Sequence, residues 1–160
     1  GIFYASKGGV TETFAKQLAE HLGADLHNMK DTNVDAIAGY DNVILMASSY
    51  FFGALMEDWG SKIKLLHTVD FNGKNVAIVG VGNQERHPDS FCSGAADFYD
   101  KLRFSGARFV GDVCACGYTF TFSRMQRGGR MLGLCLDKAD PKVQEKIDEW
   151  LKVVKPLFTK

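Results

Sequence analysis

The sequence lacks an excess of charge of either sign and lacks any long hydrophobic run. Its 19 Lys and Arg residues balance 19 Asp and Glu residues, so the formal net charge at pH 7 is zero. Bulk charge therefore gives no reason to expect a nucleic acid or an anionic membrane surface as a partner. No segment approaches the roughly 20 consecutive apolar residues that span a bilayer. No charged-then-apolar leader opens the sequence, and we expect a cytoplasmic protein with neither nucleic-acid nor membrane partners.

The usual cysteine motifs of metal and redox sites are also missing. The 4 cysteines are Cys92, Cys114, Cys116 and Cys135, and the closest pair is spaced C-x-C, whereas many zinc and redox sites use C-x-x-C. None of the 4 histidines stands at metal-ligand spacing from these cysteines or from another histidine. We therefore expect no metal site, and we expect the cysteines to be buried or half-buried thiols in a reducing cytoplasm.

Repeats and linker-like stretches are absent too, so we expect a single domain over residues 1–160. What the sequence does contain is an alternation of short apolar runs with amphipathic segments. Strand candidates are the apolar runs at 1–5, 24–29, 42–49, 76–82, 107–113 and 131–137. Helical spacing of apolar residues is expected over 10–22, 33–40, 56–69, 90–106 and 140–158.

This alternation is typical of an α/β protein with a doubly wound parallel sheet and helices on both faces. Ligands of such sheets bind beyond the carboxyl ends of the strands, at the point where the strand order reverses. The loops that follow strands one, three and four are therefore expected to form the site, at 6–11, 48–58 and 82–90.

The first loop, 6–11, reads SKGGVT. Its two glycines allow a tight turn that aims backbone N–H groups inward, and the helix that follows offers its own free N–H groups. Ser6 and Thr11 add hydroxyl donors. The loop suits a phosphate, although a glycine turn with a Ser or Thr helix cap would have the same sequence.

The other two loops offer flat side chains. Tyr50, Phe51 and Phe52 come directly after a buried strand, where they either cover the core or form a wall for a flat ligand. The third loop begins with Gly80 and Gly82, which leave backbone exposed for the close approach of a ligand, and it carries His87, whose ring is planar. Together the loops describe a phosphate at one end and flat walls on two sides. FMN fits this description, because it has one phosphate, a flexible ribityl chain and a planar isoalloxazine.

In combination these loops resemble those of the flavodoxin family, and the resemblance covers essentially the whole chain. Residues 6–11 follow the family's S/T-x-T/S-G-x-T phosphate loop, with Gly8 in place of the middle hydroxyl. Residues 47–59 and 80–91 resemble its second and third loops, and 117–137 resemble the inserted loop and resumed last strand of long-chain members. The resemblance implies a flavodoxin-like, five-stranded parallel sheet of order 2-1-3-4-5 with FMN at the switch point.

The resemblance also implies residue roles. The first loop would hold the phosphate, and Ser49 would reach the phosphate or the ribityl chain. Tyr50 would flank one face of the ring, and His87 would stand where a Tyr usually stacks on the other. The ring edge and the pyrimidine or ribityl region would be lined by the remaining residues. The full set of implied FMN contacts is Ser6, Lys7, Gly8, Gly9, Val10, Thr11, Ser48, Ser49, Tyr50, Phe51, Phe52, Gly53, Gly82, Asn83, His87, Ser90 and Cys92.

The implied function is that of an FMN-binding carrier, which shuttles low-potential electrons between redox enzymes, a reductase and acceptor enzymes. We expect a monomer, and an electron carrier rather than a catalyst with its own substrate. An alternative is an FMN-dependent quinone or flavin reductase of the same fold, with Arg124, Arg127 and Arg130 serving an anionic substrate, although these arginines would equally suit a solvated loop. Another is a flavodoxin-like binding module with an altered ligand site. A phosphoacceptor domain is disfavoured, because strands one and three end in Ser6 and Ser48 rather than in acidic residues.

Overall fold

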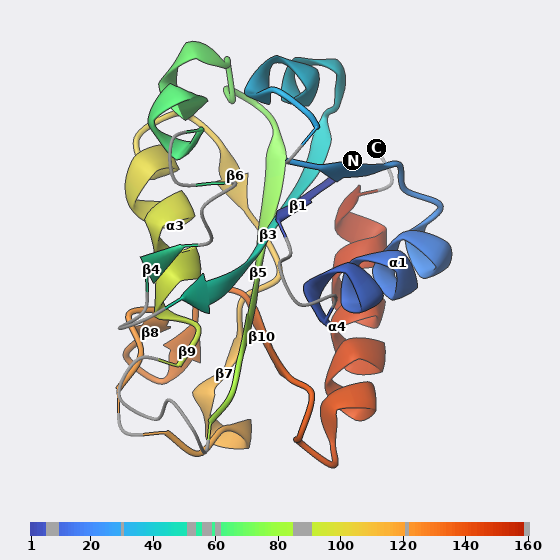
Figure 1. Cartoon of the computed structure of the whole chain (residues 1–160), viewed down its shortest axis with the longest axis vertical. Coiled ribbons are helices and arrows are strands. Elements are labelled where there is room, and N and C mark those ends of the chain that lie inside the picture. The colour runs from blue at the N-terminus through green and yellow to red at the C-terminus, as the bar shows by residue number, and fades with distance from the viewer. Residues whose placement is uncertain are drawn as a thin grey trace.

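The computed structural model describes residues 1–5, 10–29, 31–50, 54–55, 59, 62–84, 91–120 and 122–158, and only the backbone of 48–50, 54–55, 64 and 117. The strands of its main sheet are β1 Ile2–Ala5, β2 Leu26–Asn28, β3 Asn42–Tyr50, β4 Ala54–Leu55, β5 Asn75–Gly82, β6 Arg108–Phe109 and β10 Leu134–Asp137. They run in the order β10-β5-β3-β1-β2, with β4 attached to β3 and β6 to β5 (Figure 1). All pairs are parallel except that of β3 with β4. The predicted order 2-1-3-4-5 is confirmed.

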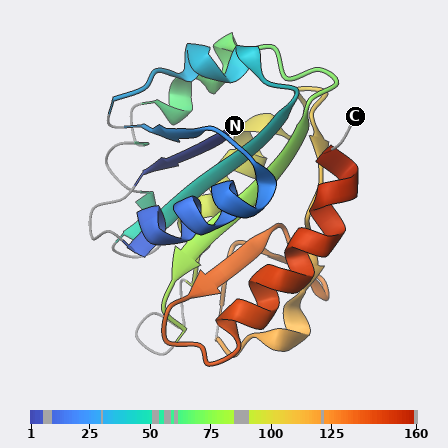
Figure 2. The ribbon, with the colours of Figure 1, turned by 90° about the vertical axis from the view of Figure 1, so that its right-hand side faces the viewer.

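Helices cover both faces of this sheet. The α-helices whose bounds lie within the described residues are α1 Val10–Leu22, α3 Ala96–Leu102 and α4 Val143–Phe158, and the 3-10 helices there are η1 Val34–Gly39, η2 Ile63–Thr68, η3 Ser93–Ala95 and η4 Ala115–Gly117. Figure 2 shows α1 and α4 side by side on the face turned to the viewer. No helix among the described residues is long and apolar enough to cross a membrane.

The strands are apolar along their whole length because each of their faces is covered. In β1, Ile2 and Tyr4 pack under α1 and α4, whereas Phe3 and Ala5 pack under η1, η2 and α3. Side chains of a strand alternate between faces, so a strand that is buried on both faces reads as a continuous apolar run. This is why the strand candidates could be read from the sequence.

The fifth strand is divided. β6 pairs with the beginning of β5, where Asn75 lies opposite Arg108, and β10 pairs with its end, where Asp137 lies opposite Gly82. The chain between β6 and β10 forms a separate antiparallel sheet of order β7-β9-β8, from β7 Val113–Cys114, β8 Gln126–Arg127 and β9 Arg130–Met131. This is the insertion that the resemblance to long-chain members predicted.

The predicted helices are confirmed most closely where their sequence signals are strongest. The first helix spans 10–22 as expected, and Gly23 ends it with φ of 64°. Before α4, Asp140 Oδ1 accepts the N–H of Lys142 at 2.9 Å, as a helix cap does. Of the helix expected over 56–69, the described residues are Trp59, which is α-helical, and the 3-10 helix η2 with its flanks, while 56–58 and 60–61 lie outside the described residues.

The expectation for the cysteines is right for one pair and wrong for the other. Cys92 and Cys135 are buried thiols. Cys114 and Cys116 are exposed and are joined in a disulfide. The two pairs differ in burial because Cys135 lies in β10 and Cys92 packs against the sheet. Cys114 and Cys116 lie on the insertion, which has little core of its own.

Candidate functional site

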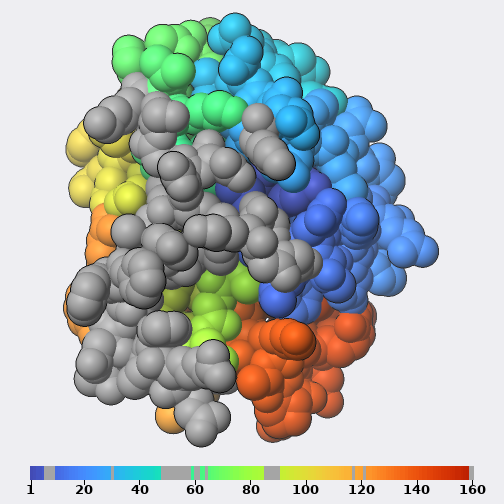
Figure 3. Space-filling view, viewed as in Figure 1, coloured from blue at the N-terminus to red at the C-terminus, as the bar shows by residue number. Residues whose placement is uncertain are grey.

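The candidate site lies at the carboxyl edge of the sheet. The arrowheads of β1, β5 and β10 point to one edge, and α1 begins at that same edge (Figure 2). The strand order reverses between β1 and β3, because the chain moves outward from β1 to β2 and then returns to the other side of β1. Figure 3 shows residues of α1 (blue), of the end of β5 (lime) and of the chain around α4 (orange-red) on one face of the molecule, whereas the residues of β1 and β10 are buried.

The end of β1 and the start of α1 carry the first predicted loop. Of its residues, Ser6, Lys7, Gly8 and Gly9 lie outside the described residues. Val10 and Thr11 form the first turn of α1, where Thr11 is only 2% exposed. The N–H groups of a first turn have no acceptor within their own helix, and they favour an anion. This turn therefore supplies the donors that a phosphate needs.

The second predicted loop leaves β3 as a hairpin. The backbone of Ser49 and Tyr50 pairs antiparallel with Leu55 and Ala54, while Ser48 pairs with β5. Phe51, Phe52 and Gly53 lie outside the described residues, as do the side chains of Ser48, Ser49 and Tyr50.

Trp59 fixes the chain just beyond this hairpin. The indole is fully buried and donates from Nε1 to the carbonyl of Met46 in β3 at 3.0 Å. Its ring meets the edge of Phe98, with ring centroids 4.7 Å apart. The second loop is thus bounded by a strand on one side and by an anchored indole on the other.

The glycines at the start of the third loop make room for another part of the chain, which the sequence did not indicate. A Cβ on Gly80 would lie 2.9 Å from Cβ of Cys92, and one on Gly82 would lie 3.2 Å from Sγ and N of Cys92. The protein's own chain thus fills the space beside both glycines, so that their lack of a side chain admits Cys92. The contacts of Gly82 and Asn83 with a ligand stay predictions, and both residues are partly exposed at the end of β5.

Cys92 itself points into the protein. It has the left-handed backbone conformation, with φ of 54°, and is 1% exposed. Burial raises the pKa of the Cys92 thiol well above its ordinary value, and the adjoining Cys135 raises it further. The thiol is neutral and faces Cys135, so its backbone is the part that borders the edge of the sheet. His87 and Ser90 lie outside the described residues.

A carboxylate that the sequence analysis did not single out holds the start of the third loop. Asp137, 4% exposed at the end of β10, accepts the backbone N–H of Gln84 at 3.0 Å and its side-chain Nε2 at 3.2 Å. Its other oxygen accepts the N–H of Ala139 at 2.9 Å. Gln84 Oε1 in turn accepts the N–H of Thr119 at 2.6 Å. The signal was present in the sequence as an aspartate that ends an apolar strand at the predicted ligand edge.

The insertion also fastens the chain that follows the third loop. Ser123 Oγ donates to the carbonyl of Phe91, and Ser93 Oγ accepts the N–H of Arg124 at 3.0 Å. The fully buried Phe91 ring packs against Tyr118 and Phe120, with ring centroids 5.6 Å apart in each case. The insertion therefore braces both ends of the third loop.

The arginines proposed for an anionic substrate are paired with acidic side chains. Arg124 contacts Asp97 at 2.6 Å and Asp100 at 2.9 Å, and Arg130 contacts Asp112 at 2.9 Å. Arg127 lies 3.8 Å from Asp100. These pairs favour the solvated-loop interpretation over a substrate site. Within the described part of the chain, no three His, Cys, Asp or Glu residues group to hold a metal ion.

The fold and the edge define a class: a doubly wound α/β protein with a helix N-terminus beside its switch point. A family profile described as flavodoxin matches residues 2–150. The chain is 35% identical to flavodoxin 1 of Azotobacter vinelandii, over 99% of this chain and 96% of that protein. It is 31% identical to flavodoxin 1 of Escherichia coli, over 96% of this chain and 91% of that protein.

A solved flavodoxin structure is similar to this chain in both fold and sequence. The crystal structure of Fusobacterium nucleatum flavodoxin bound to flavin mononucleotide has a TM-score of 0.92 and 30% sequence identity, with 99% of this chain and 98% of that chain covered. The chain belongs to the flavodoxin family.

Proposed function

We propose that this protein binds FMN at the carboxyl edge of its sheet and carries electrons between redox proteins. The observation that carries the proposal is the first turn of α1, which begins at the switch point and buries Thr11 there. Helix N–H groups and a hydroxyl at that place suit a phosphate monoester. The relative from Fusobacterium nucleatum was solved with flavin mononucleotide bound.

The residues of the chain bind and orient the flavin. Residues 6–11 hold the phosphate, Tyr50 and His87 flank the ring, and the other predicted contacts lie along the ring edge and the ribityl chain. Asp137 positions Gln84, and Trp59 positions the chain beyond β3. When bound, FMN supplies the redox chemistry through its isoalloxazine ring, and electron transfer between proteins needs no general acid or base from the chain.

The partners and setting follow from the same proposal. The protein, a single domain over 1–160, works as a cytoplasmic monomer that accepts electrons from a reductase and delivers them to acceptor enzymes. The zero net charge supports partners that do not depend on strong electrostatic steering. Neither nucleic acid nor a membrane takes part.

The visible spectrum of freshly purified protein tests the binding step, and an acceptor assay tests the transfer step. We expect flavin absorption bands, bleaching on photoreduction, and rapid return of the bands when an oxidised haem protein is added. Steady turnover of a nicotinamide cofactor with a quinone, without any acceptor protein, would instead support the reductase alternative. A colourless protein that takes up no added FMN would support the binding-module alternative.

A further inference from the structure

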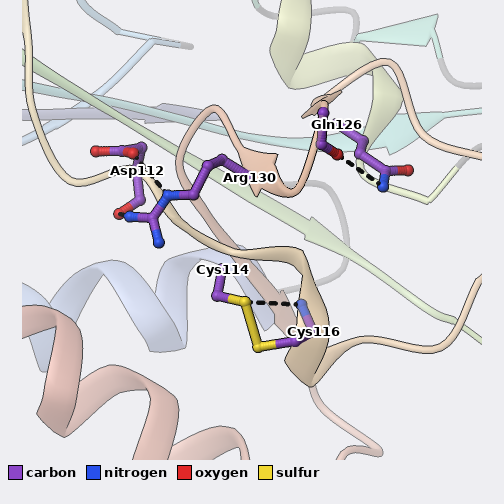
Figure 4. Close-up of a disulfide and its surroundings, with 6 residues drawn as sticks. Asp112, Cys114, Cys116, Gln126 and Arg130 are labelled. Carbon is purple, nitrogen blue, oxygen red and sulfur yellow. Dashed lines mark hydrogen bonds and ion pairs between the residues drawn. A yellow bond between two sulfur atoms is a disulfide. The ribbon is translucent and has the colours of Figure 1, made fainter.

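The disulfide on the insertion joins residues that the backbone already holds together. Cys114 ends β7 and Cys116 lies in η4, with Cα atoms 5.3 Å apart, within the ordinary range for a disulfide (Figure 4). Cys114 pairs with Arg130 in the small sheet, and the N–H of Ala115 donates to the carbonyl of Gly129 at 3.0 Å. These contacts do not involve sulfur, so they persist when the disulfide opens.

The loop that this disulfide closes contains a single residue, Ala115. The stabilisation that a disulfide gives through the unfolded chain grows with loop length, so a loop this short gains little. A bond with little structural role can open and close while the domain stays folded. That is a requirement for a reversible thiol–disulfide couple.

Access separates this pair from the other two cysteines. Cys114 and Cys116 are both exposed, whereas Cys92 and Cys135 are each 1% exposed. A cleft of about 360 Å³ adjoins the disulfide, between the insertion and the start of α4. Its lining includes both cysteines, the basic side chains of Arg130, Lys142 and Lys146, and the acidic side chains of Asp112, Glu145 and Glu149. An incoming thiolate therefore has room beside the disulfide, in a cleft whose acidic and basic side chains are equal in number.

We propose that Cys114 and Cys116 form a thiol–disulfide exchange site whose co-substrate is a dithiol, on a small molecule or a protein. A thiolate of the dithiol attacks Sγ of Cys116, a new sulfur–sulfur bond forms there, and the electron pair of the broken bond goes to Sγ of Cys114. The second thiol of the dithiol, as its thiolate, then attacks its own partner sulfur and displaces Cys116 as a thiolate. The two departing protons re-protonate the cysteines, so the protein gains two electrons and the dithiol leaves as a disulfide.

The backbone favours Cys114 as the leaving sulfur. The N–H of Cys116 donates to Sγ of Cys114 at 3.1 Å, and such a donor stabilises negative charge on that sulfur (Figure 4). The proposal goes beyond the electron-carrier function and does not depend on FMN. It agrees with a cytoplasmic setting, where disulfides are usually redox-active rather than structural.

The test is maleimide labelling of the FMN-loaded full chain under native conditions, with dithiothreitol as the dithiol. We expect no adduct on the oxidised protein, and two adducts, mapped to Cys114 and Cys116, after brief incubation with dithiothreitol. In mixtures of reduced and oxidised dithiothreitol, the labelled fraction should depend only on the ratio of the two forms. It should be the same whether the protein starts with the disulfide closed or open. Cys92 and Cys135 are the internal reference, because they should take label only in denaturant.

Two variants complete the test. With glutathione disulfide, Cys114→Ser should accumulate a stable mixed disulfide on Cys116, whereas reduced wild type should return to its internal disulfide. The double variant Cys114→Ser, Cys116→Ser should form no adduct while keeping its flavin spectrum. Two adducts without any reductant would overturn the proposal. So would reduction that occurs only when Cys92 and Cys135 also become reactive, because the bond would then open only on unfolding.

Discussion

Each face of the sheet buries one tryptophan, and the two indoles anchor different parts of the chain. Trp150, on α4, donates to the carbonyl of Gly111 at 2.8 Å, where the chain enters the insertion. Trp59, on the opposite face, donates to Met46 in β3 at 3.0 Å, close to the candidate flavin edge. The first belongs to a long regular helix that local periodicity specifies. The second fixes its own position in the chain through a contact with a strand of the core.

The largest expected effects come from replacing the two tryptophans, because both variants should lose stability but only one should lose FMN affinity. Trp59→Ala and Trp150→Ala should each lower the free energy of unfolding by about 3–5 kcal/mol, because each empties a fully packed site. Only Trp59→Ala should also weaken FMN binding at temperatures where both variants are folded. Urea unfolding of the apoprotein and FMN titration measure the two effects.

If Trp59→Ala proves too unstable, Trp59→Phe keeps most of the ring and removes the N–H donor. It should still weaken FMN more than Trp150→Phe does. Equal losses of FMN affinity in the matched pair would mean that the two faces contribute alike to the site.

On the regular face, Thr11 gives a sharper test. Thr11→Val keeps the shape of the side chain and removes the hydroxyl that we propose as a donor to the phosphate, which should weaken FMN binding by roughly ten- to a hundredfold. Thr13→Val, on the exposed side of the same helix, is the control and should change little. The affinities follow from quenching of flavin fluorescence. Unchanged binding by Thr11→Val would leave Thr11 only a structural role in α1.

On the side of the insertion, Asp137 joins β10 to the third loop. Asp137→Asn places an amide group among N–H donors, so at least one buried donor loses its acceptor, at a cost of about 1–3 kcal/mol. We expect weaker FMN binding together with the lower stability, because the start of the third loop is released. Asp148→Asn, on the exposed side of α4, is the control. An Asp137→Asn protein with wild-type flavin affinity would show that Gln84 needs no anchor.

The smallest expected effect is a pH dependence at the start of α4. Burial by itself would raise the pKa of Asp140, but hydrogen bonds from the Lys146 ammonium and the Lys142 N–H outweigh it and lower the pKa below the ordinary aspartate value. A lowered folded-state pKa stabilises the fold above the unfolded-state value and loses this contribution as the pH falls through the folded value.

Asp140→Asn keeps an oxygen that can cap α4 but removes the charge that pairs with Lys146, so it should cost about 1 kcal/mol near neutral pH and progressively less in acid below about pH 4. Thermal unfolding at a series of pH values measures the difference. A gap between wild type and variant that widens as the pH falls would contradict the assignment.

The sequence predicted the regular face better than the irregular one for a physical reason. The spacing of Phe14 and Leu18 in α1, and of Ile147, Leu151 and Val154 in α4, reports burial on one side of a helix directly. Both helices were found where this spacing placed them. On the other face, short 3-10 turns such as η2 depend on side-chain anchors from distant segments, which no local pattern encodes.

The candidate site divides in the same way. The edge and its loops followed from the fold, because parallel strands bring their carboxyl ends together. The network of Asp137, Gln84 and Thr119 could not be read from the sequence, because it joins residues 35 and 53 positions apart. The close approach of Cys92 to Gly80 and Gly82 could not be read from the sequence for a related reason, since Cys92 arrives from a later segment.

The most direct test of the central proposal is a comparison of FMN with riboflavin on the apoprotein, by titration of flavin fluorescence. The two ligands share the ring and the ribityl chain and differ in the phosphate alone. We predict FMN binding with one-to-one stoichiometry and far weaker binding of riboflavin, because the first turn of α1 provides the donors for the phosphate. Equal affinity for the two ligands, or no binding of FMN, would contradict the proposal.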